Sequence, residues 1–204
     1  MTYTCAYGWK CAVTEPSVRD SVGEEPTDEA LMKAYVTEGD PDAFATVFRR
    51  YASRLMAFFV RMVRSQAVAH DLVQQTFLQV HRARRDYRQG APFRPWLYTI
   101  ALNLRRAYFR RRGRRPETPY DAEKHPEPAV ESKVSSVRDR LVRRALADLN
   151  EGQREVIVLH WYEGYSFPEI AVMLNASLSA VKVRAHRGYE RLKILLKEAS
   201  DESS

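Results

Sequence analysis

The chain has 204 residues, of which 45% are hydrophobic, and a formal net charge of +7 from 33 basic and 26 acidic side chains. This excludes a wholly disordered chain, and no apolar run reaches the roughly 18–20 residues of a membrane span. No secretory signal is visible, and the only cysteines, Cys5 and Cys11, stand near the amino terminus, which excludes a disulfide scaffold for the body of the protein. We expect a cytoplasmic, helical protein without membrane insertion.

The basic excess is concentrated in one stretch of the sequence. Residues 28–115 carry 18 basic and 7 acidic side chains, a net charge of +11. Residues 1–27, 116–135 and 136–204 carry −2, −3 and +1. Such a localised basic surface indicates a nucleic-acid partner.

The amino-terminal half is predicted to be helical after a flexible tail over residues 1–27. Thr27 followed by two acids is typical of a helix start, Gly39 ends that helix, and Asp40 with Pro41 begins the next. Apolar residues then recur at helical spacing, at Phe44, Val47, Phe48, Tyr51, Leu55, Phe58, Phe59 and Met62.

Two more helices and a proline-containing linker are expected to follow. Ser65 begins one helix, residues 86–92 break the period as a loop, and a further helix runs from Phe93 to about Arg112. Four prolines and five acids over residues 116–135 predict an extended linker. Helical structure resumes near Ser135, and no useful β-type alternation is found.

The most specific motif lies in the carboxy-terminal half. Ser166 and Glu169 form an S-x-x-E capping box, Asn175 suits a left-handed turn, and Ser177 caps a second helix. This order is typical of a helix-turn-helix, with Leu178, Val181 and Ala185 facing inward. The alternative is a helical hairpin with a solvated basic face.

The basic half contains seven arginines in the eleven positions 105–115, interleaved with Tyr108 and Phe109. Guanidinium groups neutralise phosphates, and aromatic rings stack on unpaired bases. A solvated helix end is the alternative. The loop between Tyr87 and Phe93 is either a plain surface loop or a segment that captures a flipped base.

Together these segments resemble the extracytoplasmic-function sigma factors of the sigma-70 family. The resemblance rests on Asp40-Pro41-Asp42-Ala43-Phe44, on residues 71–77 and 93–103, and on residues 150–196 with their helix-turn-helix. It implies an all-α fold of two small helical domains. These are sigma region 2 over residues 28–115 and sigma region 4 over residues 136–199, joined by the acidic linker 116–135 and followed by a tail over residues 200–204.

The resemblance also implies three sets of binding residues. The −35 element is expected to be read by Arg154, Ser177, Ser179, Ala180, Lys182, Val183, Arg184, His186 and Arg187. The −10 element is expected to meet Tyr87, Arg88, Gln89, Phe93, Trp96, Asn103, Arg106 and Arg110. Core polymerase is expected to bind Asp71, Gln74, Gln75, Phe77 and Gln79, for which a plain solvated face is the alternative.

The function implied is that of an alternative sigma factor. It binds core RNA polymerase through the β′ clamp helices and the β flap, recognises promoter DNA and opens the −10 element, and an anti-sigma factor is expected as a further partner. No enzyme motif, cofactor site or metal site is found. The rivals are a stand-alone helix-turn-helix regulator and an interaction module whose main partner is an anti-sigma protein. Ala180 and Val183 replace the family's usual Thr and Ser, so the −35 sequence preference is not transferable.

Overall fold

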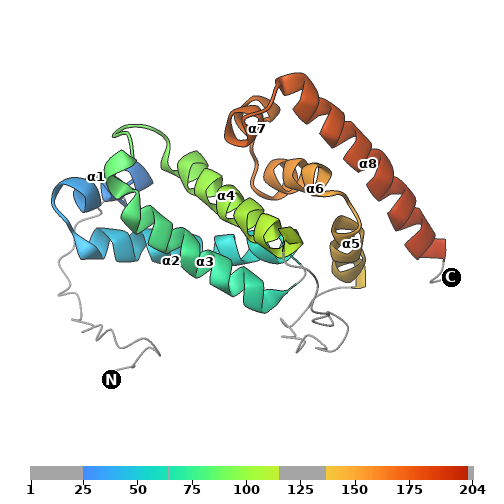
Figure 1. The fold of residues 1–204 in the computed structure, drawn as a ribbon, viewed down its shortest axis with the longest axis horizontal. Helices are drawn as coiled ribbons and strands as arrows, with labels where there is room; N and C mark the ends of the chain where they lie inside the picture. Colours follow the sequence, from blue (N-terminus) through green and yellow to red (C-terminus); the bar gives the residue numbers. More distant parts are fainter. Residues whose placement is uncertain (1–24, 64, 115–136, 202–204) are drawn as a thin grey trace.

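The computed structural model describes residues 25–63, 65–114 and 137–201, which form helices and their connections without any strand (Figure 1). The predicted tail up to residue 24, with Cys5 and Cys11, and the predicted linker 116–135 lie outside the described residues. The elements are α1 (Asp28–Thr37), α2 (Pro41–Met62), α3 (Gln66–Arg82), a 3₁₀ turn η1 (Arg84–Asp86), α4 (Phe93–Arg114), α5 (Val137–Ala147), α6 (Glu151–Ile157), a π-helical turn η2 (Val158–Tyr162), α7 (Phe167–Leu174) and α8 (Leu178–Asp201).

The helix starts predicted in the amino-terminal half are confirmed by their capping hydrogen bonds. The side chains of Thr27, Asp40 and Ser65 each accept a backbone N–H from the first turn of α1, α2 and α3. Gly39 has a φ of +72°, a left-handed conformation that separates α1 from α2. Local sequence therefore determines where these helices begin.

Helices α1 to α4 pack around an aromatic core to which α2 contributes most of its predicted face. Val47, Leu55 and Phe58 are fully buried. Phe48 was expected to point inward, and this prediction is wrong, because its side chain is 43% exposed. It lies at the rim of the core, where its ring centroid is 4.6 Å from that of Phe77 on α3.

Helices α5 to α8 form the second unit, in which α8 approaches α6 very closely. A Cβ atom placed on Gly188 would lie 2.5 Å from Cδ1 of Ile157, so the end of the Ile157 side chain would have to move to admit any other residue there. Leu178 was expected to face inward with Val181 and Ala185. The latter two are buried, but Leu178 is 39% exposed because it opens the first turn of α8 at the edge of the unit.

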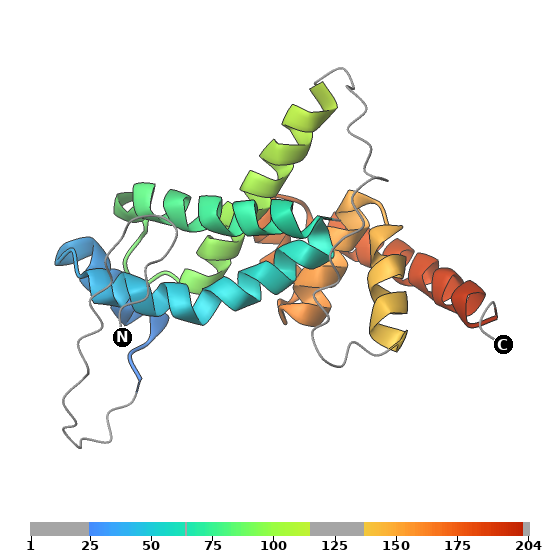
Figure 2. The same cartoon turned by 90° about the horizontal axis from the view of Figure 1, so that it is seen from below.

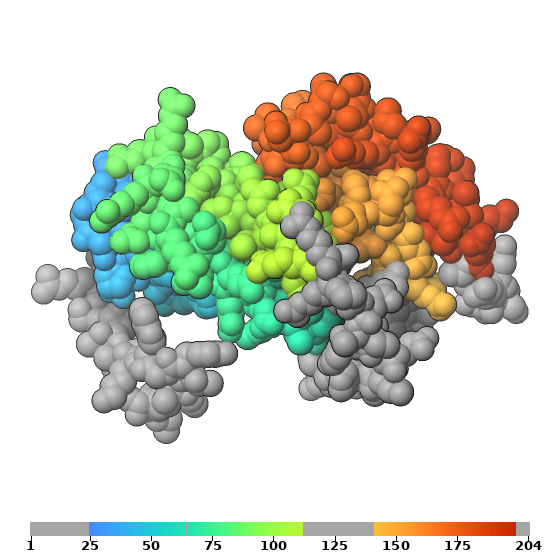
Figure 3. All heavy atoms as spheres, viewed as in Figure 1, coloured from blue at the N-terminus to red at the C-terminus, as the bar shows by residue number. Residues whose placement is uncertain are grey.

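The two units pack against each other rather than standing apart. Helix α4 contacts α7, and α2 contacts both α5 and η2. One buried apolar cluster runs through both units, from Met32 on α1 to Ala185 on α8. The space-filling view shows the atoms of α6 and α7 lying next to those of α4 (Figure 3). The carboxy-terminal part of α4 projects away from the other helices (Figure 2).

Candidate nucleic-acid and polymerase interfaces

The helix-turn-helix predicted at the carboxy-terminal end is present as α7, a turn and α8. The Ser166 N–H donates to the Glu169 carboxylate at 2.8 Å, and the Glu169 N–H donates to the Ser166 hydroxyl at 3.5 Å, which completes the capping box. The Ser166 hydroxyl also donates to the Glu169 carboxylate, at 2.6 Å, and this bond, together with the one from the Ser166 N–H, holds the pKa of Glu169 below its ordinary value of 4.5. Asn175 adopts the left-handed conformation, with φ 48° and ψ 52°, and turns the chain into α8.

Helix α8 presents a polar and basic face at its amino-terminal end. Ser177 caps the helix by accepting the Ala180 N–H at 3.2 Å. Because Val181 and Ala185 are buried, the opposite side of the helix faces solvent. The predicted −35 residues on this side are exposed at Ser177, Ser179, Lys182, Val183, His186 and Arg187, and half-buried at Ala180 and Arg184.

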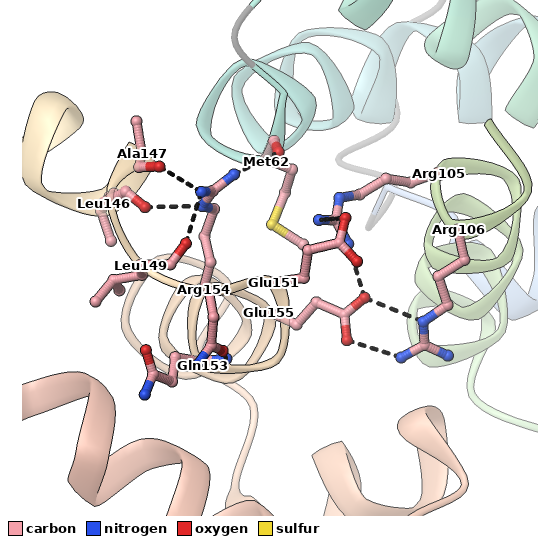
Figure 4. A network of polar contacts seen from close by, with 11 residues as sticks. Met62, Arg105, Arg106, Leu146, Ala147, Leu149, Glu151, Gln153, Arg154 and Glu155 are labelled. Carbon is pink, nitrogen blue, oxygen red and sulfur yellow. Dashed lines mark hydrogen bonds and ion pairs between the residues drawn. The ribbon is translucent and has the colours of Figure 1, made fainter. Parts of the chain in front are cut away.

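Arg154, also predicted to contact the −35 element, lies elsewhere. Its side chain is buried, and its guanidinium donates to the carbonyl oxygens of Leu146, Ala147 and Leu149 at 2.6–2.8 Å. A further bond reaches the carbonyl of Met62 at 3.1 Å (Figure 4). The guanidinium therefore closes the end of α5 and ties α6 to the end of α2, and it is not presented to DNA in this arrangement.

The residues predicted to meet the −10 element divide into two groups. Tyr87 and Phe93 are buried in the core, where the Tyr87 hydroxyl donates to the Ala91 carbonyl and the Phe93 N–H donates to the Glu29 carboxylate at 3.0 Å. These two aromatic rings pack in the core. The local sequence does not distinguish an aromatic residue that packs in a core from one that stacks on a base. Among the other predicted residues, four are exposed, namely Arg88, Gln89, Asn103 and Arg110, and Trp96 is half-buried. Arg106 is paired with an acidic residue of α6.

Arg106 belongs to a network of ion pairs between α4 and α6 (Figure 4). Its Nε and Nη2 donate to the two oxygens of Glu155 at 3.0 and 2.8 Å, as a two-pronged fork. Arg105, which is fully buried, donates to Glu155 at 2.8 Å and to Glu151 at 3.2 Å. Sequence reasoning missed this network, since nothing in the local pattern pairs residues about fifty positions apart.

A second polar contact joins the units at the end of the π-helical turn. Glu163, which is 7% exposed, accepts the hydroxyl of Tyr98 and a guanidinium N–H of Arg94 at 3.3 Å. Burial and the hydrogen bond to this carboxylate raise the pKa of Tyr98, which keeps the phenol protonated as a donor. Gly164, with a φ of +72°, then turns the chain toward α7.

The face of α3 predicted to bind polymerase is largely open to solvent. Asp71, Gln74 and Gln75 are exposed and Gln79 is half-buried, whereas Phe77 is buried against Phe44 and Phe48 of α2. Leu78 is 47% exposed beside these polar residues and was not among the residues predicted to bind polymerase. Leu78 lies outside the apolar face predicted for this helix, and an apolar residue at such a position indicates exposure to solvent.

Titratable side chains in the described ranges do not gather into a metal site, because no cluster of three His, Cys, Asp or Glu residues is found there. His81 bonds to the hydroxyl of Tyr35, and His160 bonds through Nδ1 to the Tyr165 carbonyl at 2.7 Å. Both rings are held by packing partners. Within the described segments, none of the helices combines the length and apolar character needed to cross a bilayer.

Comparison with known proteins places both units in one family. Residues 47–115 match the profile of Sigma-70 region 2, and residues 139–192 match Sigma-70, region 4. RNA polymerase sigma factor CarQ of Myxococcus xanthus is 42% identical over 165 residues, which cover 79% of this chain and 93% of CarQ. ECF RNA polymerase sigma factor SigE of Mycolicibacterium smegmatis is 32% identical, over 89% of this chain and 72% of SigE. The chain belongs to the extracytoplasmic-function sigma factors of the sigma-70 family.

The family assignment agrees with the fold. The sigma factor RpoE of Bartonella quintana, solved in complex with the anti-sigma factor NepR, is 26% identical, with a TM-score of 0.62 over 76% of this chain and 96% of RpoE. The chain is thus an alternative sigma factor that binds RNA polymerase and promoters. Its family consists of transcription initiation factors, which are not enzymes. A stand-alone helix-turn-helix regulator is not favoured, because such a protein has no need of region 2.

Proposed function

We propose that this sigma factor reads the −35 element with α8 and engages the −10 element with the loop before α4 and the outer face of α4. The observation that carries this assignment is the exposed basic face of α8, presented by a fully capped helix-turn-helix. A recognition helix inserts its amino-terminal residues into the major groove. Lys182 and Arg187 then supply hydrogen bonds to base edges or phosphates. Ser177 and Ser179 lie at the amino-terminal end of α8, which approaches the DNA backbone.

We assign the −10 contacts only to those predicted residues whose side chains are at least partly exposed to solvent. Arg88 and Gln89 directly precede Gly90 in the loop, and Asn103 and Arg110 lie two turns apart on α4. Trp96 is half-buried, and the exposed part of its ring is proposed to stack on an unpaired base. Binding of unpaired bases offsets the free energy needed to separate the strands.

Core polymerase is proposed to bind the exposed face of α3. Asp71, Gln74 and Gln75 supply hydrogen bonds, and exposed Leu78, one turn beyond Gln74 and Gln75, adds an apolar contact. The β′ clamp helices fit this face and the β flap fits region 4, as the family resemblance implies. Because polymerase is its partner, we propose that the protein acts in the cytoplasm.

An anti-sigma factor is proposed as the regulatory partner. The relative RpoE is known in complex with an anti-sigma factor. Since both units of this chain contact each other, a single inhibitor would meet both at once.

In vitro transcription with purified core polymerase tests the proposal. Core plus this chain is expected to initiate from a set of promoters that core alone does not use, and the two proteins are expected to elute together from a sizing column. If the chain fails to associate with core, or binds promoter duplex tightly without it, the assignment is wrong.

A further inference from the structure

The amino-terminal part of α8 carries an apolar side chain at its most outward position. Val183 stands two residues from Val181 and two from Ala185, and both of these side chains are buried in the second unit. At about 100° per residue, this spacing puts Val183 on the opposite side of the helix from both. Its side chain is 47% exposed. The centre of the proposed recognition face is therefore apolar, although the face as a whole is polar and basic.

The residues around Val183 on the helix surface fit DNA. Ala180 lies one turn before Val183, is half-buried and ends in a methyl group. His186 and Arg187 lie one turn after Val183, and both are exposed, as is the adjacent Lys182. Cationic side chains attract phosphates, so the charges beside this apolar spot complement a nucleic acid rather than an apolar protein surface.

The chemistry of valine limits which base it can recognise. Its side chain neither donates nor accepts hydrogen bonds, so it does not read the donors and acceptors of the base edges. The apolar group that B-DNA presents in the major groove is the C5 methyl of thymine. Over guanine, adenine or cytosine, the same side chain would remove water from polar atoms without replacing their hydrogen bonds, which costs free energy. A valine at this position thus favours one base and disfavours the other three.

We propose that Val183 is a specificity-determining residue that reads the C5 methyl of a thymine in the −35 element. Lys182 and Arg187 hold the DNA on either side, and Ala180 extends the apolar strip that receives the methyl group. This inference rests on the proposed function, since it assigns a base to the face of α8 that enters the major groove. It gives a role to an exposed side chain for which hydrogen bonding provides none.

The size of the effect follows from the burial of one methyl group, which changes an affinity about fourfold. Replacing the thymine by deoxyuridine removes the C5 methyl and leaves base pairing unchanged. This replacement should weaken binding about threefold to fivefold. Val183→Ala withdraws the partner of the methyl group, so it should remove the difference between thymine and deoxyuridine.

Val183→Thr tests the same assignment from the protein side. Threonine has nearly the shape of valine but adds a hydroxyl, which donates and accepts hydrogen bonds. The variant is therefore expected to accept other bases at the position where the unaltered chain selects thymine. Sequencing of the DNA that each protein selects measures this change. An unchanged preference for thymine in Val183→Thr would contradict the assignment.

The experiment uses holoenzyme assembled from core polymerase and the full chain. A pool of duplex DNA randomised over the promoter region is selected for binding to holoenzyme and sequenced, which identifies the preferred −35 bases. Each preferred thymine is then replaced singly by deoxyuridine, on either strand, and competition binding at fixed salt measures the affinity. Ile194→Ala is the matched control, because Ile194 is 48% exposed on the same helix but lies three turns beyond Val183.

A threefold to fivefold loss at one −35 thymine supports the assignment if it vanishes in Val183→Ala and persists in Ile194→Ala. An equal loss in Val183→Ala and the unaltered chain overturns it, as does the absence of any deoxyuridine effect. Co-elution of each variant with core confirms that it is folded. The proposed function fails separately, when the selected DNA shows no −35 preference that Lys182→Ala/Arg187→Ala removes. A −35 preference that α8 controls but deoxyuridine leaves unchanged refutes only the role of Val183.

Discussion

Helices α4 and α8 are both rich in basic residues, yet the fold treats them in opposite ways. On α8, Lys182 and Arg187 are exposed, and none of the ion pairs found among the described residues involves either side chain. On α4, Arg105 and Arg106 are held by the carboxylate of Glu155. The basic charge of one helix is open to a partner, while part of the charge of the other is neutralised from within.

The difference teaches that net charge along a sequence does not measure the charge available to a ligand. The stretch 28–115 has a net charge of +11, but acids from the second unit pair with three of its arginines, Arg94, Arg105 and Arg106. The near-neutral second unit supplies those acids and still displays a basic recognition face. Accessible charge is thus a property of the packed chain.

The largest expected effect concerns α8, whose basic face is exposed. Lys182→Ala combined with Arg187→Ala should lower −35-dependent initiation by more than about thirtyfold, because each base or phosphate contact contributes about 1–3 kcal/mol. Quantitative in vitro transcription measures this, with core binding unchanged. Lys193→Ala/Lys197→Ala, at exposed positions further along α8, is the control. Equal losses in both double variants would refute the α8 assignment.

The second effect tests the buried arginine against its predicted role in DNA binding. Arg154→Met should destabilise the protein by about 3 kcal/mol, because four backbone carbonyls lose the hydrogen bond that they accept from Arg154. Urea unfolding followed by circular dichroism measures the change, with exposed Arg191→Met as the control. Unchanged stability with weaker −35 binding would restore the role that the sequence predicted.

The third effect addresses the contact between Tyr98 and Glu163. Tyr98→Phe removes a buried hydrogen bond and should lower the free energy of unfolding by about 1–2 kcal/mol near neutral pH. Because the pKa of Tyr98 is raised in the folded chain, this contribution is fully present below the unfolded value of 10.0 and is lost as the pH rises further. Urea unfolding of both proteins across this range should show the difference shrinking above pH 10. A difference that stays constant would contradict the assignment.

The smallest effect concerns the capping box that presents α8. Ser166→Ala should cost about 1 kcal/mol of stability, the usual contribution of a helix cap. Since the pKa of Glu169 is lowered by its bonds to Ser166, the contribution is present above pH 4.5 and fades as the pH falls below that value. Thermal unfolding at neutral and acidic pH provides the measurement, and exposed Ser53→Ala is the control. An equal loss at both pH values would argue against the carboxylate's part in the cap.

Much of the fold was predictable from local sequence. Capping residues such as Thr27 and Ser166, and the left-handed Asn175, act within one or two turns, so their effect is written in neighbouring positions. The outward side of α8 followed from helical periodicity for the same reason. Periodicity was less reliable at the edges of packed faces, where Phe48 and Leu178 proved exposed.

The tertiary structure alone decided which polar residues are available. Sequence established two helical units, a helix-turn-helix and a basic stretch, because each depends on spacing and composition over short distances. It did not reveal that Arg154 is buried or that Glu155 holds Arg105 and Arg106. The ion pairs of Glu155 join segments about fifty positions apart, and Arg154 is enclosed by carbonyls at the ends of both α5 and α2. Both outcomes also depend on a balance of desolvation and pairing that exists only once the two units are packed together.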